Sequence, residues 1–418
     1  MAAIKKITVQ TMSKEKKNMV VPELRFPEFQ KEPEWSLPTL GEISERIEDK
    51  VGTQALTTVS ISAGIGFVSQ AEKFSRDISG QQYKNYIVLK KGGFAYNKGN
   101  SKKFPQGCVY KLKEFEIAAV PNAFITFRFK KVVVADFYIG YFENNLHGKQ
   151  LQKFITSGAR MDGLLNISPD SFFSIVLPTP KERDEQQKIA SCLSSLDDLI
   201  TAHTQKLDAL KAHKKGLMQQ LFPAEGEKAP KLRFEEFKGS GEWEIKMLGE
   251  IAKNLDNKRV PITSNEREKG NIPYYGASGV IDYVKEFIFD DDLLCVSEDG
   301  ANLMDRTYPI AFSISGKTWV NNHAHVLKFA NNFTQIIVEN YLNEINLEDF
   351  LTGMAQPKLN RAKLDQIPIP LAKDEKEQQK IAACLSSLDE LITAQAEKLA
   401  QLKLHKKGLM QGLFPQLG

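Results

Sequence analysis

One pattern is written twice in this 418-residue chain, and that duplication limits the architectures open to it. The motif P-x-L-R-F-x-x-F occupies residues 22–29 and returns at residues 230–237. A shared offset of 208 residues makes this a single register rather than a chance similarity. Two more pairs have the same offset, namely E-W at 34–35 and 242–243, and L-G-E-I at 40–43 and 248–251.

A second duplicated block is longer and better preserved. Residues 185–223 and 377–415 share 30 identities in 39 positions at an offset of 192. The segments between the duplicated blocks cannot be aligned. We therefore expect that roughly 50–165 and 256–360 escaped duplication and carry whatever differs between the two halves.

The second block has the narrow apolar stripe of a coiled coil. A 4-3 spacing holds for ten successive seam positions in each copy, of which eight are apolar, whereas a helix lying on a core would show a broader apolar face. His203 and Lys214 interrupt the stripe at the same places as Gln395 and Lys406, and polar seam residues of this kind set register and partner. The residues expected to pair the helices or dock subunits are Ile189, Leu193, Leu196, Ile200, Leu207, Leu210, Ile381, Leu385, Leu388, Ile392, Leu399 and Leu402.

Chain connectivity indicates the direction of pairing. A helix of about 40 residues is about 60 Å long. The first helix ends near Phe222, the linker is 223–229, and Leu232 already belongs to the second copy, so the nine or ten residues in between reach at most about 35 Å. The second globular domain must therefore start at the far end of the first helix. The second helix then returns along the first, which predicts an antiparallel pair and a molecule with pseudo-two-fold symmetry.

Composition favours an intracellular, water-soluble chain. The net charge of +4 permits a polyanionic partner but is mild for a dedicated nucleic-acid binder, so we expect partner subunits to share the phosphate contacts. No apolar run is long enough to span a membrane. The four cysteines are scattered, which argues against a zinc site and a disulfide framework and favours the cytoplasm. Residues 1–20 are Lys-rich and are expected to form a disordered tail.

Motifs that would indicate catalysis are incomplete. Gly316 to Thr318 resembles the end of a P-loop, but Ala311 stands where the loop needs glycine. Asn271 to Tyr274 differs by one residue from the Asn-Pro-Pro-Tyr motif of amino-methyltransferases, and no glycine-rich cofactor loop accompanies it. His323 and His325 lack a third ligand at a sensible spacing, so we expect no metal. The chain is therefore expected to be non-catalytic.

Clusters of basic and amide side chains in both halves are candidates for contacts to DNA. Residues 86–103 are expected to form a hairpin with a basic loop, which is either a DNA-contacting patch or the solvated rim of a hairpin. Lysine neutralises phosphates, and asparagine pairs with an adenine edge. The candidates in the first half are Lys98, Asn100, Lys102, Lys103 and Arg160. Those in the second half are Lys258, Arg259, Lys317, Asn321, Asn322, His323, Gln356, Lys358, Asn360 and Arg361.

Taken together, these motifs resemble the specificity subunit of a type I restriction–modification system, and the likeness covers the chain from about residue 20. The resemblance rests first on the duplicated motifs, which include E-Q-Q-K-I-A near the start of each helix and K-K-G-L-M-Q-x-L-F-P at the end of each helix. I-P-Y-Y-G-A-S-G at 272–279, S-E-D-G-A-N-L at 297–303 and V-N-N-H-A-H-V at 320–326 add to it. The first copy departs from the Q-P-K-L-N element of the second, since it has Met-Asp-Gly-Leu-Leu-Asn at 161–166.

The resemblance implies an α/β fold with two target recognition domains, each followed by a conserved spacer helix. It implies binding to double-stranded DNA at an asymmetric bipartite site, two modification subunits that methylate adenine, and restriction subunits. S-adenosylmethionine, ATP and Mg would belong to those partners, with no cofactor in this chain. The implied segments are 21–180 for domain 1, 181–222 for helix 1, 230–372 for domain 2 and 373–415 for helix 2. Two alternatives remain, a single-chain DNA methyltransferase with fused recognition domains and a coiled-coil adaptor that reads no sequence.

Overall fold

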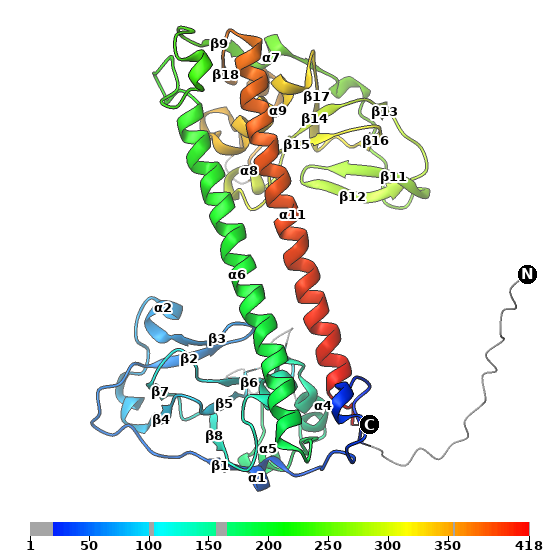
Figure 1. Cartoon of the computed structure of the whole chain (residues 1–418). Helices are drawn as coiled ribbons and strands as arrows, with labels where there is room; N and C mark the ends of the chain where they lie inside the picture. The colour runs from blue at the N-terminus through cyan, green and yellow to red at the C-terminus, as the bar shows by residue number, and fades with distance from the viewer. Residues whose placement is uncertain (1–19, 100–103, 156–164, 354–355, 418) are drawn as a thin grey trace, which may run out of the picture. The chain divides into compact units, whose positions relative to one another are not determined.

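The chain divides into two compact units, which are described separately. Unit 1 comprises residues 1–202 and 400–418, and unit 2 comprises residues 203–399. Each unit combines antiparallel sheets, and in unit 2 also a mixed sheet, with short helices and a part of both long helices (Figure 1). The computed structural model describes residues 20–99, 104–155, 165–353 and 356–417.

The two long helices are α6 (Arg183–Leu221) and α11 (Glu375–Leu413), each of 39 residues. Acidic residues in both first turns favour the start, since carboxylates interact well with a helix N-terminus. Pro223 and Pro415 follow the ends, where proline cannot continue a helix. No helix in the described part of the chain is long and apolar enough to cross a membrane.

Within each unit the long helices pair in opposite directions. In unit 1, Leu193 near the start of α6 enters the same core as Phe414 just beyond the end of α11. In unit 2, Leu221 at the end of α6 enters the same core as Leu385 near the start of α11. The twelve residues predicted to pair the helices are all buried or half-buried. The predicted fold class, two α/β domains with long antiparallel helices, is confirmed.

The polar seam residues make specific contacts. Gln395 donates from Nε2 to both Nδ1 and the backbone oxygen of His203, each at 2.8 Å. The 192-residue offset equates these two residues, so the contact joins one position of the repeat to its own copy. His203 is therefore a structural seam residue, as the sequence predicts.

The seam lysines form ion pairs that are equivalent between the units. In unit 2, Lys214 Nζ lies 2.5 Å from Asp389 Oδ1. In unit 1, Lys406 Nζ lies 2.5 Å from Asp197 Oδ1, the repeat equivalent, and 2.6 Å from Glu143 Oε2. Each lysine thus fixes the helix pair in one register, and Lys406 also ties it to the globular part of unit 1.

The duplicated P-x-L-R-F motif holds each globular domain on the start of its own long helix. Arg25 forms a bidentate pair with Glu185, at 2.7 Å for both bonds, and Arg233 does the same with Glu377. Both carboxylates are almost completely buried, with 1% of the side chain exposed. These buried pairs explain why the motif and the E-Q-Q-K-I-A segment are repeated together.

Each unit contains a four-stranded antiparallel sheet of the same strand order. Phe94 pairs with Phe127 in unit 1, and Leu294 pairs with Leu327 in unit 2, so both positions are displaced by 200 residues. A second ladder, Leu89 with Ala118 and Phe289 with Thr318, has the same displacement. The first sheet is β1 (Ser44–Arg46), β8 (Ile125–Phe129), β5 (Phe94–Asn97) and β6 (Cys108–Lys111), and the second is β10 (Ala252–Asn254), β17 (Ala324–Phe329), β14 (Leu293–Ser297) and β15 (Ala311–Ile314).

The expectation that residues 50–165 and 256–360 escaped duplication is therefore wrong at the level of structure. The strands and their register are duplicated, whereas the side chains have diverged. A sheet position requires alternation of buried and exposed residues, and many apolar side chains satisfy it. In these strands the two copies no longer share sequence identity, but the strands still pair in the same register.

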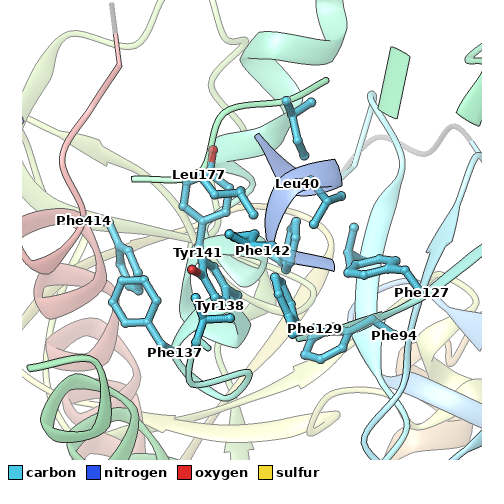
Figure 2. Packing of buried hydrophobic residues seen from close by; sticks show 14 of the residues in the cluster. Leu40, Phe94, Phe127, Phe129, Phe137, Tyr138, Tyr141, Phe142, Leu177 and Phe414 are labelled. Carbon is cyan, nitrogen blue, oxygen red and sulfur yellow. The ribbon is translucent and has the colours of Figure 1, made fainter. Parts of the chain in front are cut away.

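The core of unit 1 is rich in aromatic residues (Figure 2). Phe94 stacks on Phe127 with ring centroids 5.4 Å apart, and Phe129 stacks on Tyr138 at 4.3 Å. Phe414 contributes from beyond α11 and lies 5.2 Å from Phe137. Burial of such rings dominates the stability of a core because each removes a large apolar area from water.

The remaining elements cover these sheets or extend them. In unit 1 the hairpin of β2 (Val59–Ser62) and β3 (Gly66–Ser69) precedes α2 (Gln70–Phe74), whereas unit 2 has the longer hairpin of β11 (Lys269–Gly276) and β12 (Gly279–Val284). The other strands are β4 (Ile87–Lys90), β7 (Ile117–Val120), β9 (Glu244–Met247), β13 (Phe289–Asp290), β16 (Lys317–Val320) and β18 (Pro368–Leu371). The other helices are α1 (Leu40–Ile43), α3 (Phe137–Glu143), α4 (Leu146–Gln152), α5 (Pro169–Phe173), α7 (Leu248–Ile251), α8 (Asn302–Asp305), α9 (Asn332–Glu344) and α10 (Arg361–Asp365), with short 3-10 turns at Pro27–Phe29, Gly80–Asn85, Glu235–Phe237, Asp256–Lys258 and Glu348–Phe350.

Candidate nucleic-acid interface

Four loops of unit 2 that are far apart in the sequence meet at one end of its sheets. They are residues 274–277, 297–300, 321–325 and 356–361, and we call them the four-loop cluster. All four contain residues of the motifs singled out in the sequence. The strands deliver three of them, because β11 and β14 end at the first two and β17 starts in the third.

Hydrogen bonds join the four loops directly. Ser297 donates from Oγ to the Ala277 backbone oxygen at 2.5 Å, and the Asn321 amide donates to the Tyr275 oxygen at 3.0 Å. Two bonds from neighbouring loops converge on residue 298: its amide donates to the His323 oxygen at 2.9 Å, and its oxygen accepts from the Leu359 amide at 2.8 Å. The cluster is therefore one connected surface rather than four independent loops.

A buried network of charged groups supports the cluster from below. His325 has 1% of its side chain exposed, and its Nδ1 lies 2.6 Å from Asp256 Oδ2 while Nε2 lies 2.7 Å from the Leu359 oxygen. Arg259 Nη1 contacts Glu298 Oε2 at 2.7 Å. The ring nitrogens of His325 thus bridge two loops, and buried charges of this kind are stable only when paired.

The two carboxylates of the network are held in their charged form. Burial alone would raise the pKa of Asp256, but hydrogen bonding and charge from His325, with the Val326 amide, lower it below its usual value. For Glu298 the desolvation is likewise outweighed, chiefly by the hydrogen bond from Arg259, so its pKa is also lowered. Both carboxylates are therefore ionised at neutral pH.

Asp256, Glu298 and His325 also satisfy the geometry of a cation site, since their ligand atoms lie within 4.8 Å of one another. Those atoms already have partners. Arg259 and Lys358, the latter 3.2 Å from Glu298 Oε1, bring two positive charges to the same carboxylates. A divalent ion would have to displace these side chains, so the chemistry of the cluster does not favour a metal.

Several side chains predicted to contact DNA are exposed on or beside the four-loop cluster. Lys358 has half of its side chain exposed, and His323 has 51% exposed. The exposed predicted residues on or beside the cluster are Lys258, Asn322, His323, Gln356, Lys358 and Arg361.

Three predicted residues have structural roles instead, and we withdraw them as DNA contacts. Arg259 is largely buried and its guanidinium is taken up by Glu298 and the Ala324 oxygen. Asn321 is 5% exposed, and its Oδ1 accepts the His323 amide at 2.8 Å. Asn360 caps α10 by accepting the Lys363 amide at 3.0 Å, as asparagine commonly does.

Lys317 is exposed but is not part of the four-loop cluster. It begins β16, whereas the loop at 321–325 follows the end of that strand, about 10 Å further along. Its Nζ lies 4.8 Å from the centre of the Phe287 ring. Lys317 therefore stays a predicted DNA contact that lies outside the four-loop cluster.

Unit 1 places two of its loops at the equivalent edge. Lys98 follows β5 as Glu298 follows β14, and its backbone oxygen accepts the Leu165 amide at 3.0 Å just as the oxygen of Glu298 accepts that of Leu359. Asn100, Lys102, Lys103 and Arg160 were also predicted to contact DNA. These four lie outside the described residues.

Sequence reasoning missed two residues at these edges. Asn122 is exposed just before β8, at the position that corresponds to Asn322 before β17. The only signal for it is a valine two residues before each asparagine, which is too weak without the strand register. Asp299 was also missed, and it lies beside His323 with ring-to-carboxylate distances of 2.9 and 3.1 Å.

Comparisons with known proteins agree with this architecture. Residues 240–404 match the family described as type I restriction modification DNA specificity domain. A putative type I restriction enzyme specificity subunit of Haemophilus influenzae is 39% identical over 130 residues, which cover 31% of this chain and 33% of that protein. The MjaX subunit of Methanocaldococcus jannaschii, a putative type I restriction enzyme specificity subunit, is 26% identical over 297 residues, covering 67% of this chain and 68% of that protein.

Solved structures show the same fold. The S subunit of a type I restriction–modification system from M. genitalium superposes with a TM-score of 0.65 at 15% identity, covering 95% of this chain and all of that one. A chain from a structure of type I restriction–modification complex assembly gives a TM-score of 0.51 at 15% identity, covering 91% and 97%. At this identity the likeness concerns the fold alone.

Proposed function

This chain belongs to the type I restriction–modification DNA specificity subunits, and on that premise we propose that its two domains read the two halves of an asymmetric, bipartite DNA site. The chain itself is non-catalytic. Each domain presents loops at the same edge of an equivalent sheet, which is where a duplicated reader would contact two separate DNA segments. The single observation that carries the proposal is that the equivalent sheet edges of the two domains carry different side chains.

The side chains at the shared edge differ in charge and shape. Lys98 in unit 1 corresponds to Glu298 in unit 2, and the exposed Ala123 corresponds to the exposed His323. Base edges in the major groove are distinguished by their pattern of donors and acceptors, so surfaces that differ in this way recognise different bases. We therefore infer two different half-sites rather than a palindrome.

Partner subunits would supply the chemistry. We propose that two modification subunits methylate adenine within the bound site and that restriction subunits join the complex. S-adenosylmethionine, ATP and Mg would act in those partners, and the compartment would be the cytoplasm. The mild net charge of +4 supports this sharing, because a chain that bound DNA alone would need more cations for the phosphates.

The test uses the full-length chain assembled with its modification partner on a randomised DNA library. We expect two short, different motifs separated by a fixed gap of unspecified bases. Asn322→Ala and Lys358→Ala should weaken binding of the second half-site alone, by about 1–3 kcal/mol for a lost base contact and less for a phosphate contact. Absence of any sequence preference would support the adaptor alternative, and methylation by the chain alone would support the fused methyltransferase.

A second experiment tests the proposed spacing role of the helices. The His203–Gln395 contact joins equivalent positions, so seven residues inserted beside each of them keep every seam residue opposite its partner. Each insertion lengthens its helix by about 10 Å. We expect the gap between the half-sites to grow by about three base pairs at 3.4 Å each, with both motifs unchanged. An unchanged gap in a complex that still binds would contradict the spacing role.

A further inference from the structure

His323 is held rigidly at the exposed side of the four-loop cluster. Its amide donates to Asn321 Oδ1 at 2.8 Å, and its backbone oxygen accepts the Glu298 amide at 2.9 Å. Its ring nitrogen Nδ1 lies 2.9 and 3.1 Å from the two carboxylate oxygens of Asp299. Half of the side chain nevertheless remains exposed. A half-exposed histidine that is held at two backbone groups and one ring nitrogen differs from a surface histidine without such contacts.

The contact with Asp299 determines what the exposed side of the ring can do. An ionised carboxylate only accepts hydrogen bonds, so Nδ1 must carry the hydrogen. In a neutral imidazole the other nitrogen is then an acceptor. Nε2, the only ring nitrogen not facing Asp299, therefore offers one directed lone pair.

The charged groups next to His323, other than Asp299, have partners of their own. Glu298, the adjacent acidic residue, is taken up by Arg259 and Lys358. The other nearby histidine, His325, is turned inward to Asp256. Asp299 thus orients His323, while the network beneath fixes the loop that carries Asp299.

We propose that His323 is a specificity-determining residue that accepts a hydrogen bond at Nε2 from an exocyclic amino group, adenine N6 or cytosine N4, in the major groove. Asp299 acts as its positioning residue. The inference rests on the proposed DNA-reading function and adds the chemical class of base that is read. Unit 1 has Ala123 at the equivalent position, so the effect is confined to the half-site read by unit 2.

The experiment uses the full-length chain with its modification partner, a constant first half-site and a randomised second half-site. It is run at about pH 8, above the range in which histidine usually gains a proton. We expect one position to be enriched in adenine or cytosine and His323→Ala to reduce that discrimination about tenfold, as for one lost base contact. The enriched base itself distinguishes the two amino donors. His323→Gln, whose amide oxygen also accepts, should retain part of the preference.

Variants of Asp299 separate positioning from a purely structural role. Asp299→Asn keeps an oxygen that accepts from Nδ1 and should preserve the preference, whereas Asp299→Ala should relax the same position as His323→Ala. Unchanged base frequencies in His323→Ala, or loss of a preference for guanine or thymine, would overturn the inference while the proposed function stands. A wild-type complex without any preference would overturn both.

Discussion

The two globular domains share one sheet register but fill it with different kinds of side chain. Phe94, Tyr96 and Phe127 in unit 1 stand where unit 2 has Leu294, Val296 and Leu327. At these three positions the aromatic side chains of one domain are replaced by aliphatic ones in the other, with the same strand pairing. Duplication therefore preserved the pattern of burial and the contacts to the long helices, while packing and surface loops were free to change.

The buried pairs Arg25–Glu185 and Arg233–Glu377 have less similar surroundings than their duplicated motifs suggest. Trp35 donates from Nε1 to Glu185 at 3.2 Å, adding a third hydrogen bond to that buried carboxylate. In unit 2 the corresponding Trp243 Nε1 is buried and makes no hydrogen bond among the described residues. Glu377 therefore depends more completely on Arg233 than Glu185 does on Arg25.

The largest predicted effect exploits this difference. Arg233→Ala leaves Glu377 buried without its ion-pair partner and should destabilise unit 2 by about 3–5 kcal/mol. Arg25→Ala should cost unit 1 less, because Trp35 still donates to Glu185. Hydrogen exchange resolved by peptide would report each unit separately, and equal losses in the two variants would contradict the role given to Trp35.

The second prediction concerns pH and rests on a buried histidine of unit 1. His147 in unit 1 is completely buried, and burial lowers its pKa to about 3. Because its folded pKa lies below the unfolded value of about 6.5, unit 1 should lose stability as pH falls through that interval, at up to about 1.4 kcal/mol per pH unit. Unfolding of unit 1 followed from pH 7 to pH 4.5 measures this slope.

Unit 2 should behave differently over the same range. The pKa values of Asp256 and Glu298 are lowered, so their contribution persists above the ordinary carboxylate range and disappears only as pH falls through the folded values, below about 4. Burial raises the pKa of Glu339, which adds stability to unit 2 as pH falls. His147→Leu should abolish the slope of unit 1, and a slope that survives this substitution would rule out His147 as its source.

The smallest predicted effects come from the seam lysines. Lys406 contacts two carboxylates and is 11% exposed, whereas Lys214 contacts one and is 21% exposed. Lys406→Met should therefore cost unit 1 about 2 kcal/mol and Lys214→Met should cost unit 2 about 1 kcal/mol, since hydrogen bonds to charged groups contribute more when less solvated. Urea titrations monitored by hydrogen exchange would rank the two losses of stability. The reverse order would argue that the Lys406–Glu143 ion pair does not stabilise unit 1.

Part of the candidate site was accessible from sequence because its motifs are compact. The segments around Asn322 and Lys358 stand out by composition alone, and both are exposed on the four-loop cluster. Their companions were misjudged where a polar side chain turned inward. Arg259 and Asn360 carry the right chemistry for DNA, but a buried carboxylate and a helix terminus use it instead. Composition cannot distinguish these uses, because only neighbours in space decide them.

The sequence alone determined the duplication, the two long helices and the positions of their seam, since these depend on spacing within a few turns of one helix. It also determined that polar residues interrupt the seam at equivalent places. Only the tertiary structure decided that the two diverged middles each form a sheet of the same strand order and that four separate loops of unit 2 form one surface. Strand pairing and loop convergence join residues many positions apart, and many sequences satisfy the same alternation of buried and exposed positions.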